Sequence, residues 1–444
     1  MQQNQPANFK NRIGFVLASV GSAVGMGNIW LFPSRMSQYG ATFLIPYFLF
    51  VALIASTGVI GEMAFGRAAA GGPMIAFAAA AERRTGRRNW GEALGLVPVL
   101  GSLTMAIGYS VVVGWLLKYA VGAFTGSVLS RDGVDAFSAL FTETASSWGN
   151  TAWQVVAMVL TLLIMTFGIA SGIEKANKVM MPLFFLLFLG LAVYIATLPG
   201  ASAGYRYLFV LDPAGLLDPY VWVYALGQAF FSLSVTGSGM IVYGAYLSKD
   251  EDVVDVAQHT ALFDTIAAVV AALVIIPACF SYGQDVGAGP GLLFVTLPTI
   301  LQDIPLGRLF AVILYVAMIF AGVSSLQNMF EAVAESLQHK FPKLSRVAVL
   351  GILCVLCLGF GLLMEPISKW GPWMDFVSIY IIPIGATLGA ISWFYVMKKD
   401  DLLDAVNTGS RRHRGAVWYS VGRYVYVPLA LVLCCVALFM NVSF

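Results

Sequence analysis

The sequence is poor in charged residues. Asp, Glu, Lys and Arg make up 11% of its 444 residues, and the formal net charge is only +2. No long acidic or basic run occurs. A chain this close to neutrality has no electrostatic basis for binding nucleic acid, and we therefore expect no nucleic-acid partner.

Histidine and cysteine are also scarce. The three histidines are isolated from one another, and all five cysteines lie within apolar segments. Metal centres and histidine-based catalysis require clusters of such residues, whereas single buried cysteines are typical core residues. No nucleophile stands near a candidate base, so the sequence predicts that the protein is not an enzyme.

Apolar residues dominate instead. Hydrophobic residues account for 59% of the chain and the mean hydropathy is +0.82, which indicates a polytopic membrane protein. A spanning helix needs about 20 apolar residues. We predict eleven spans, at 13–37, 41–69, 91–124, 153–170, 177–198, 220–247, 258–283, 307–338, 345–363, 372–397 and 418–441. The apolar stretch Leu292 to Leu301 is too short to span and is expected to form an outer hairpin.

The basic residues predict the orientation of these spans. With a cytoplasmic N-terminus, 19 of the 25 Lys and Arg residues fall inside, and the outside set is Arg35, Lys118, Arg131, Arg206, Arg308 and Lys369. Positive charge favours the cytoplasmic side of a membrane. We therefore expect a multi-pass protein of the cell inner (plasma) membrane, surrounded by lipid, with its C-terminus outside.

The first span is interrupted. Gly21 to Pro33 reads GSAVGMGNIWLFP, and its three glycines fall within seven residues. Each Gly costs about 1 kcal/mol relative to Ala inside a helix, so the segment is expected to unwind. Unwound backbone at membrane depth is tolerated where it is buried in protein or lines a cavity. Close helix packing through small residues is the alternative, and we favour a binding site.

The sixth span has a similar interruption. Ser232 to Gly239 contains three Ser, one Thr and two Gly between apolar flanks. Broken helices five spans apart are typical of two inverted five-helix repeats whose discontinuous helices meet at the bilayer midplane. We therefore predict one transmembrane domain over residues 1–444, with repeats at about 13–198 and 220–397 and an extra helix at 418–441.

Two further features are polar within apolar spans. Ser324 and Ser325 form a hydroxyl pair, although Ser in a membrane helix often bonds to its own backbone. Asp264 lies in an apolar run, where a carboxylate is a functional candidate unless it lies at the membrane surface.

These motifs resemble the neurotransmitter:sodium symporter family. The resemblance is carried by GSAVGMGNIWLFP and by IPYF at 45–48, SGIEKANKVMMP at 171–182, GQAFFSLS at 227–234 and FAGVSS at 320–325. It covers nearly the whole chain in order. It implies an all-α integral membrane fold of the LeuT type, a 5+5 inverted repeat with broken helices one and six.

The resemblance also implies two sodium sites. Site one would use Ala23, Asn28, Ser232 and Asp264 together with the substrate carboxylate, and site two would use Gly21, Val24, Ala321, Ser324 and Ser325. Oxygen ligands of these kinds also suit a hard cation on chemical grounds. No chloride dependence is expected, because Asp264 would supply a fixed negative charge where chloride-dependent relatives need an anion.

The implied substrate is a neutral amino acid. Its site would comprise Ser22, Ala23, Met26, Gly27, Met105, Tyr109, Phe231, Ser232, Ser234, Gly237, Ser325 and Met329. Gly25 stands where amine transporters carry an Asp, which favours a substrate with its own carboxylate. Gly237 stands where many relatives carry Phe, so we expect an enlarged pocket and a preference for large hydrophobic side chains.

The gates depart from the family pattern. The usual outer Arg is Leu31, its acidic partner resembles Asp375, and Arg35 is a candidate substitute. The usual inner Arg is also missing, which leaves Lys10 or Arg12 with Glu335 as candidate contacts. Gly172 and Pro182 match positions that let span five unwind in relatives, although both also read as ordinary helix-end residues.

The expected function is sodium-coupled symport that imports neutral, large hydrophobic amino acids by alternating access. The alternatives are a proton-coupled or sodium-independent exchanger of the same fold, with Asp264 titrating, and an amino-acid receptor that does not translocate. A monomer is expected to suffice for transport, and the sequence is compatible with a dimer.

Overall fold

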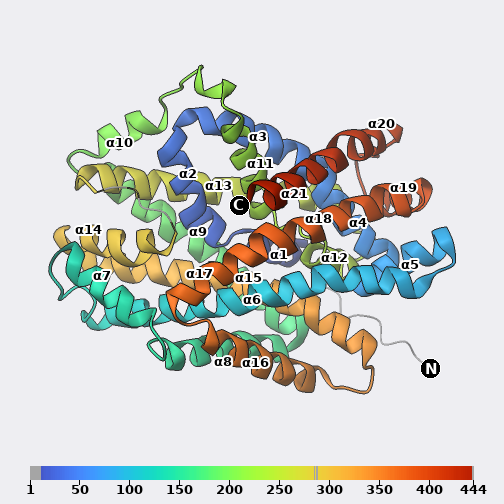
Figure 1. The fold of residues 1–444 in the computed structure, drawn as a ribbon, viewed down its shortest axis with the longest axis horizontal. Coiled ribbons are helices and arrows are strands. Elements are labelled where there is room, and N and C mark those ends of the chain that lie inside the picture. Colours follow the sequence, from blue (N-terminus) through green and yellow to red (C-terminus); the bar gives the residue numbers. More distant parts are fainter. Residues whose placement is uncertain (1–11, 285, 287–288, 443–444) are drawn as a thin grey trace.

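The computed structural model describes residues 12–284, 286 and 289–442. Within these residues the chain is entirely helical and contains no strand. Figure 1 shows an elongated bundle with one group of short helices at each end of its long axis. One end carries α5 (Pro73–Thr85) and α19 (Lys399–Asn407), and the opposite end carries α7 (Gly133–Thr144), α10 (Ala201–Leu208) and α14 (Leu297–Asp303).

Each predicted span coincides with one helix or with a run of helices. The unbroken spans are α3 to α4 (Ala41–Ala69, with η2 at Ala55–Val59), α6 (Arg88–Thr125), α8 (Thr151–Thr166), α9 (Glu174–Ala196), α13 (Val253–Ser281), α15 (Gly307–Lys340), α16 (Arg346–Leu363), α17 to η7 (Ile367–Val396) and α20 to α21 (Ala416–Met440). Within the composite runs the bounds are α3 Ala41–Ile54, α4 Ile60–Ala69, α17 Ile367–Phe376, η6 Val377–Ile381, α18 Ile382–Ile391, η7 Ser392–Val396, α20 Ala416–Val421, η8 Gly422–Tyr426 and α21 Val427–Met440.

Among the described residues, eight helices are long and apolar enough to cross a membrane, or nine when one bent pair is counted as a span. These lengths and compositions agree with a polytopic membrane protein, and the count of eleven stays a prediction.

The first predicted break is present. Helix α1 (Arg12–Ala23) is followed by η1 (Gly27–Leu31) and α2 (Phe32–Tyr39), and the two halves bend by 56°. The Asn28 side-chain oxygen accepts a hydrogen bond from the Gly25 backbone N–H at 2.9 Å. This bond satisfies a donor that the break would otherwise leave without a partner.

The second predicted break lies between α11 (Pro219–Ser232) and α12 (Gly239–Ala245). Ser234 and Gly237 both have positive φ, at 52° and 78°, so the helix cannot continue through them. The Ser238 N–H donates to Glu62 Oε1 of α4 at 2.9 Å. A buried carboxylate from a neighbouring span therefore supports the start of the second half-helix.

Long helices enclose the two broken spans. Helices α6 and α15 pack along one another, and α1 packs against α9, α13 and α15. Figure 1 shows α6 and α15 following the long axis of the bundle. The interrupted backbone is therefore buried in protein, which is the condition for irregular structure at membrane depth.

The expected outer hairpin is wrong in detail. Residues 292–303 form one short helical segment, η5 (Leu292–Thr296) followed directly by α14, rather than two arms. The Phe294 ring lies against Phe141 and Trp115, with ring centroids 5.2 and 5.8 Å apart. These aromatic contacts give the apolar stretch a protein partner, so it does not need to turn back on itself.

Basic side chains join segments at the end of the bundle that carries α5 and α19, and we call this the basic end. Arg83 of α5 pairs with Asp401 of α19 at 2.8 Å. Arg67 of α4 donates to the carbonyls of Glu251 and Thr408 at 2.6 and 2.7 Å. Arg67 and Arg83, both assigned to the cytoplasmic side, thus join segments at this end of the structure.

Candidate functional site

The two breaks meet at a cluster of polar side chains, which we call the Asp264 cluster. Asn28 Nδ2 lies 2.7 Å from Asp264 Oδ1 and 3.0 Å from Ser232 Oγ. The Ser232 hydroxyl donates to Asp264 Oδ2 at 2.7 Å. All three side chains are buried, and they come from η1, α11 and α13. Three residues predicted for sodium site one are therefore in direct contact.

The residues predicted for sodium site two also lie together. Ser324 Oγ donates to the Ala321 carbonyl at 2.9 Å, and Ser325 Oγ donates to the Val24 carbonyl at 3.2 Å. A Cβ built on Gly21 would lie 3.0 Å from the Ser324 Cβ. We call this group on α1 and α15 the Ser324 cluster.

A small cavity borders both clusters. It has about 50 Å³ of space for water centres, and it is lined by Ser22, Ala23, Gly25, Gly27, Asn28, Ser102, Met105, Tyr109, Phe231, Ser232, Ser234, Thr236, Ser238, Ser325, Asn328, Met329 and Ile382. Roughly 10–15 Å³ measured in this way holds one water molecule. The cavity therefore has room for only a few water molecules. A larger ligand must displace flexible side chains such as Met105 and Met329.

Nearly all of the predicted substrate residues line the cavity, and the exceptions are Met26 and Gly237. The Met26 side chain is buried and approaches Gly322 of α15, which leaves only its backbone for the predicted role. A Cβ on Gly237 would lie 2.7 Å from the Gly385 carbonyl oxygen. Gly237 therefore faces α18 rather than the cavity.

The expected enlargement of the pocket through Gly237 is wrong. Gly237 lies against Gly385, and a Cβ on Gly389 would lie 3.2 Å from the Gly237 Cα. The space that a side chain at position 237 would take is filled by the backbone of α18. Its missing side chain consequently allows close helix packing and leaves no extra room for substrate.

Two glycines on the cavity wall lie close to neighbouring side chains. A Cβ on Gly25 would lie 2.9 Å from Ser325 Oγ and 3.3 Å from Tyr109 Oη. A Cβ on Gly27 would lie 2.7 Å from the ring of Phe231. A side chain at position 25 therefore has no room, which agrees with a site that lacks a carboxylate for a substrate ammonium group.

Several lining residues were not predicted. Ser102 of α6 and Ser238 share a hydrogen bond of 2.7 Å between their hydroxyl oxygens, and Asn328 donates to the Gly239 carbonyl at 3.3 Å. Glu62 contacts Ser238 from outside the lining. Its lone carboxylate within the apolar span 41–69 was a usable signal, because charged residues inside membranes are costly.

The donor chemistry of both clusters fits sodium. Their side chains present carboxylate, amide and hydroxyl oxygens beside backbone carbonyls, which are ligands that hard cations prefer. No group of three or more His, Cys, Asp or Glu residues suited to a metal occurs in the described part of the chain. A transition-metal centre is not needed to explain these polar contacts.

The expected outer gate does not form in this conformation. The Arg35 guanidinium lies 3.7 Å from the centre of the Tyr224 ring, and among the described residues no ion pair joins it to Asp375. Trp30 of η1 instead meets Trp370 of α17 edge to face, with ring centroids 6.2 Å apart. An aromatic contact thus joins η1 to α17, the helix that carries Asp375.

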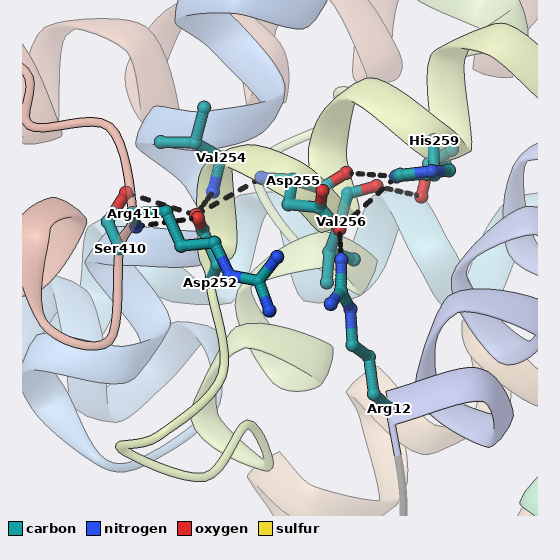
Figure 2. A network of polar contacts seen from close by, with 9 residues as sticks. Arg12, Asp252, Val254, Asp255, Val256, His259, Ser410 and Arg411 are labelled. Atoms are coloured by element: carbon teal, nitrogen blue, oxygen red, sulfur yellow. Dashed lines mark hydrogen bonds and ion pairs between the residues drawn. The ribbon is translucent and has the colours of Figure 1, made fainter.

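Arg12, one of the two candidate partners of Glu335, does not contact it. Arg12 at the start of α1 pairs with Asp255 at the start of α13, and the His259 ring nitrogen lies 3.2 Å from the same carboxylate (Figure 2). Glu335 lies against Gly72, since a Cβ there would be 1.8 Å from Glu335 Oε2. Lys10, the other candidate, lies outside the described residues.

Asp252 also joins the loop after α19 to the start of α13. Its carboxylate accepts hydrogen bonds from the Val254 and Arg411 backbone N–H groups, both at 2.9 Å (Figure 2). The loop after α19 and the N-terminal turn of α13 are thereby joined. Polar contacts therefore join the start of α1, the start of α13 and this loop.

Span five is helical around Gly172 and Pro182. Gly172 lies in η3 (Ile169–Ile173), and Pro182 lies within α9. A Cβ on Gly172 would lie 2.1 Å from the Ile164 carbonyl oxygen, so the glycine permits a close contact with the end of α8. The predicted unwinding is absent from this conformation, in which residues 169–196 are helical.

Comparisons with known proteins agree with this architecture. The chain matches the sodium:neurotransmitter symporter family over residues 6–139 and 131–443. It is 35% identical to the uncharacterized sodium-dependent transporter YhdH of Bacillus subtilis, over 98% of each chain. It is 28% identical to an uncharacterized sodium-dependent transporter of Methanocaldococcus jannaschii, over 97% of this chain and 90% of the relative.

A solved structure has the same fold. The crystal structure of MhsT in complex with L-phenylalanine superposes with a TM-score of 0.86 at 30% identity, and the match covers 98% of this chain and 99% of MhsT. The predicted LeuT-type helical fold is thereby confirmed. The chain belongs to the sodium:neurotransmitter symporter family, and it is a sodium-dependent, multi-pass membrane transporter rather than an enzyme.

Proposed function

We propose that this transporter imports neutral amino acids with large hydrophobic side chains, driven by the inward movement of Na⁺. The observation that carries the proposal is the contact among Asn28, Ser232 and Asp264 at the wall of a cavity between two broken spans. A cation held by these oxygens would lie beside a substrate carboxylate in the cavity. Each ligand would then raise the affinity of the other.

The first sodium ion would be held by Ala23, Asn28, Ser232 and Asp264. The second would be held by the Gly21, Val24 and Ala321 carbonyls with Ser324 and Ser325. The hydrogen bonds within the Asp264 and Ser324 clusters support both assignments, because they bring the proposed ligands within reach of one another. The fixed carboxylate of Asp264 supports transport without chloride.

The cavity wall supports the proposed substrate class. Met105, Phe231, Met329 and Ile382 provide an apolar surface, while the backbone at Gly25 and Gly27 faces the same space. The absence of an acidic side chain at position 25 favours a zwitterionic substrate over an amine. MhsT, whose solved complex contains L-phenylalanine, supports a large apolar side chain.

The membrane orientation is part of the proposal. We assign the basic end to the cytoplasm, because it carries Arg67 and Arg83 and positive charge favours that side. Substrate would enter past the contact between Trp30 and Trp370, and it would leave after the Arg12 to Asp255 pair opens. A single chain contains both clusters and the cavity, so a monomer suffices for this cycle.

Thermal stabilisation of the purified protein tests the proposal. The melting temperature would be measured with each of the twenty amino acids, first in Na⁺ and then in K⁺ at equal ionic strength. We expect stabilisation by a few large neutral amino acids in Na⁺ alone, since a ligand that binds the native state raises its stability. Equal stabilisation in K⁺ would support a sodium-independent exchanger, and binding without uptake would identify a receptor.

A further inference from the structure

Helix α1 touches α9 through two glycines seven residues apart. A Cβ on Gly14 would lie 2.3 Å from Glu174 Oε1, and a Cβ on Gly21 would lie 2.3 Å from Asn177 Oδ1. Both α9 side chains are at most 1% exposed. Two polar groups, one helical turn apart, therefore lie directly against the backbone of the first broken span.

The Asn177 amide has an unpartnered oxygen. Its Nδ2 donates to the Ile173 carbonyl at 3.0 Å and to Gln327 Oε1 at 3.1 Å. Asn177 Oδ1 and Gln327 Nε2 have no hydrogen-bond partner, although both residues are 0% exposed. Turning both amides would pair these two atoms, but it would remove the donor from the Ile173 carbonyl and direct an N–H group at Gly21. The arrangement with Oδ1 facing α1 is therefore favoured.

The unpartnered oxygen lies next to the Ser324 cluster. Gly21 is shared, because the same Cβ position would lie 2.3 Å from Asn177 Oδ1 and 3.0 Å from the Ser324 Cβ. Gln327 lies one helical turn after Ser324 on α15. From the Ser324 cluster toward the start of α1, Asn177 lies against Gly21 and Glu174 lies against Gly14.

We propose that Asn177 Oδ1 is a transient sodium ligand through which the ion leaves the Ser324 cluster toward the basic end. The inference rests on the proposed sodium coupling and adds an exit position to it. A buried amide oxygen without a partner can accept a hard cation, and its lack of charge keeps the ion weakly held. Glu174, which is paired with Lys178 at 2.6 Å, would be the next oxygen-bearing group on this route.

The experiment compares Asn177→Asp and Asn177→Leu with the unmodified full-length protein. Radiolabelled Na⁺ is bound to purified protein, and its loss is followed after dilution into unlabelled Na⁺. A carboxylate holds a cation more tightly than an amide does, so Asn177→Asp should slow sodium loss and lower the half-saturating Na⁺ concentration by about tenfold. Asn177→Leu should leave the half-saturating concentration within about threefold while changing the rate of sodium loss by about tenfold, because site two keeps its own ligands.

Gln327→Met is the matched control. It removes the hydrogen bond to Asn177 Nδ2 and leaves the Asn177 oxygen in place. If Asn177 acted only through packing, then Asn177→Leu and Gln327→Met would change sodium loss to the same extent. We expect Gln327→Met to retain a rate of sodium loss close to that of the unmodified protein.

The outcomes separate this inference from the proposed function. Sodium binding by the unmodified protein, with unchanged kinetics and affinity in both Asn177 variants, would overturn the exit position alone. An absence of sodium binding by the unmodified protein would overturn both. If Asn177→Leu fails to fold, the affinity of Asn177→Asp still decides the question.

Discussion

Replacing Asp264 by Asn tests the Asp264 cluster most sharply. The carboxylate accepts hydrogen bonds of 2.7 Å from both Asn28 and Ser232. An Asn side chain can keep both contacts, because its oxygen accepts from Asn28 while its amide group donates to the Ser232 hydroxyl. The substitution therefore removes the charge with little change in shape.

The expected effect is a loss of sodium affinity, and substrate affinity falls with it because the two ligands are coupled. Interactions of a charged group with a polar partner contribute about 1.5 to 3 kcal/mol, and we take this range for the carboxylate and the ion. Since 1.4 kcal/mol corresponds to tenfold in affinity, Asp264→Asn should raise the half-saturating Na⁺ concentration by about 10- to 150-fold. The assay is the melting temperature as a function of Na⁺, with choline balancing ionic strength and L-phenylalanine present throughout.

Asp401→Asn provides the control, since it removes the same charge from an ion pair of 2.8 Å with Arg83 at the surface. Exposed pairs contribute about 0–1 kcal/mol, so its sodium dependence should match that of the unmodified protein. A half-saturating concentration for Asp264→Asn within twofold of the unmodified value would refute the reasoning. A companion variant, Asp264→Ser, should regain sodium affinity when chloride replaces gluconate, because a mobile anion then supplies the missing charge.

Two glycine substitutions test the geometry of the cavity wall. Gly25→Ala places a methyl group 2.9 Å from Ser325 Oγ, so half-saturation by L-phenylalanine in the thermal assay should require about tenfold more ligand, a loss of about 1.4 kcal/mol. Gly237→Ala forces a φ of 78° on a residue with a Cβ, which costs about 1–2 kcal/mol and should lower the melting temperature without ligand. Gly190→Ala, where a Cβ has no neighbour within 4 Å, is the control for both. Substrate affinity unchanged by Gly25→Ala, or a melting temperature unchanged by Gly237→Ala, would contradict the respective contact.

The broken spans were predictable because their causes are local. Three glycines within seven residues weaken any helix, and the Ser-rich and Gly-rich middle of 232–239 does the same. The side chains that these breaks expose, such as Asn28 and Ser232, were identified from the resemblance to a known family. The contacts of Asn28 with Ser232 and Asp264 needed the structure, because they join residues 204 and 236 positions apart.

The predictions that failed depended on which residue, distant in the sequence, packs against a given position. A missing side chain at Gly237 was expected to leave a wider pocket, whereas the backbone around Gly385 occupies it. Arg35 was a candidate substitute for the missing outer arginine, and it lies over the Tyr224 ring. Packing across the bundle decides such choices, and sequence patterns within one span carry no information about it.

The short surface helices were missed for a related reason. Helices α5, α7, α10 and α19 contain between 8 and 13 residues, and they are too short for a hydropathy window that detects spans. Their formation depends on docking against the bundle, since short isolated helices are marginal in water. Arg83 and Asp401, which join α5 to α19, show one such docking contact.

Sodium-driven uptake is the most direct test of the proposed function. Purified protein would be reconstituted into liposomes loaded with K⁺, and uptake of radiolabelled L-phenylalanine would be followed with Na⁺ or K⁺ outside. We predict transient accumulation above the external concentration only with an inward Na⁺ gradient, which collapses when the gradient is dissipated. Equal uptake with and without that gradient would contradict sodium coupling, and no accumulation of any large neutral amino acid would contradict the proposed substrate class.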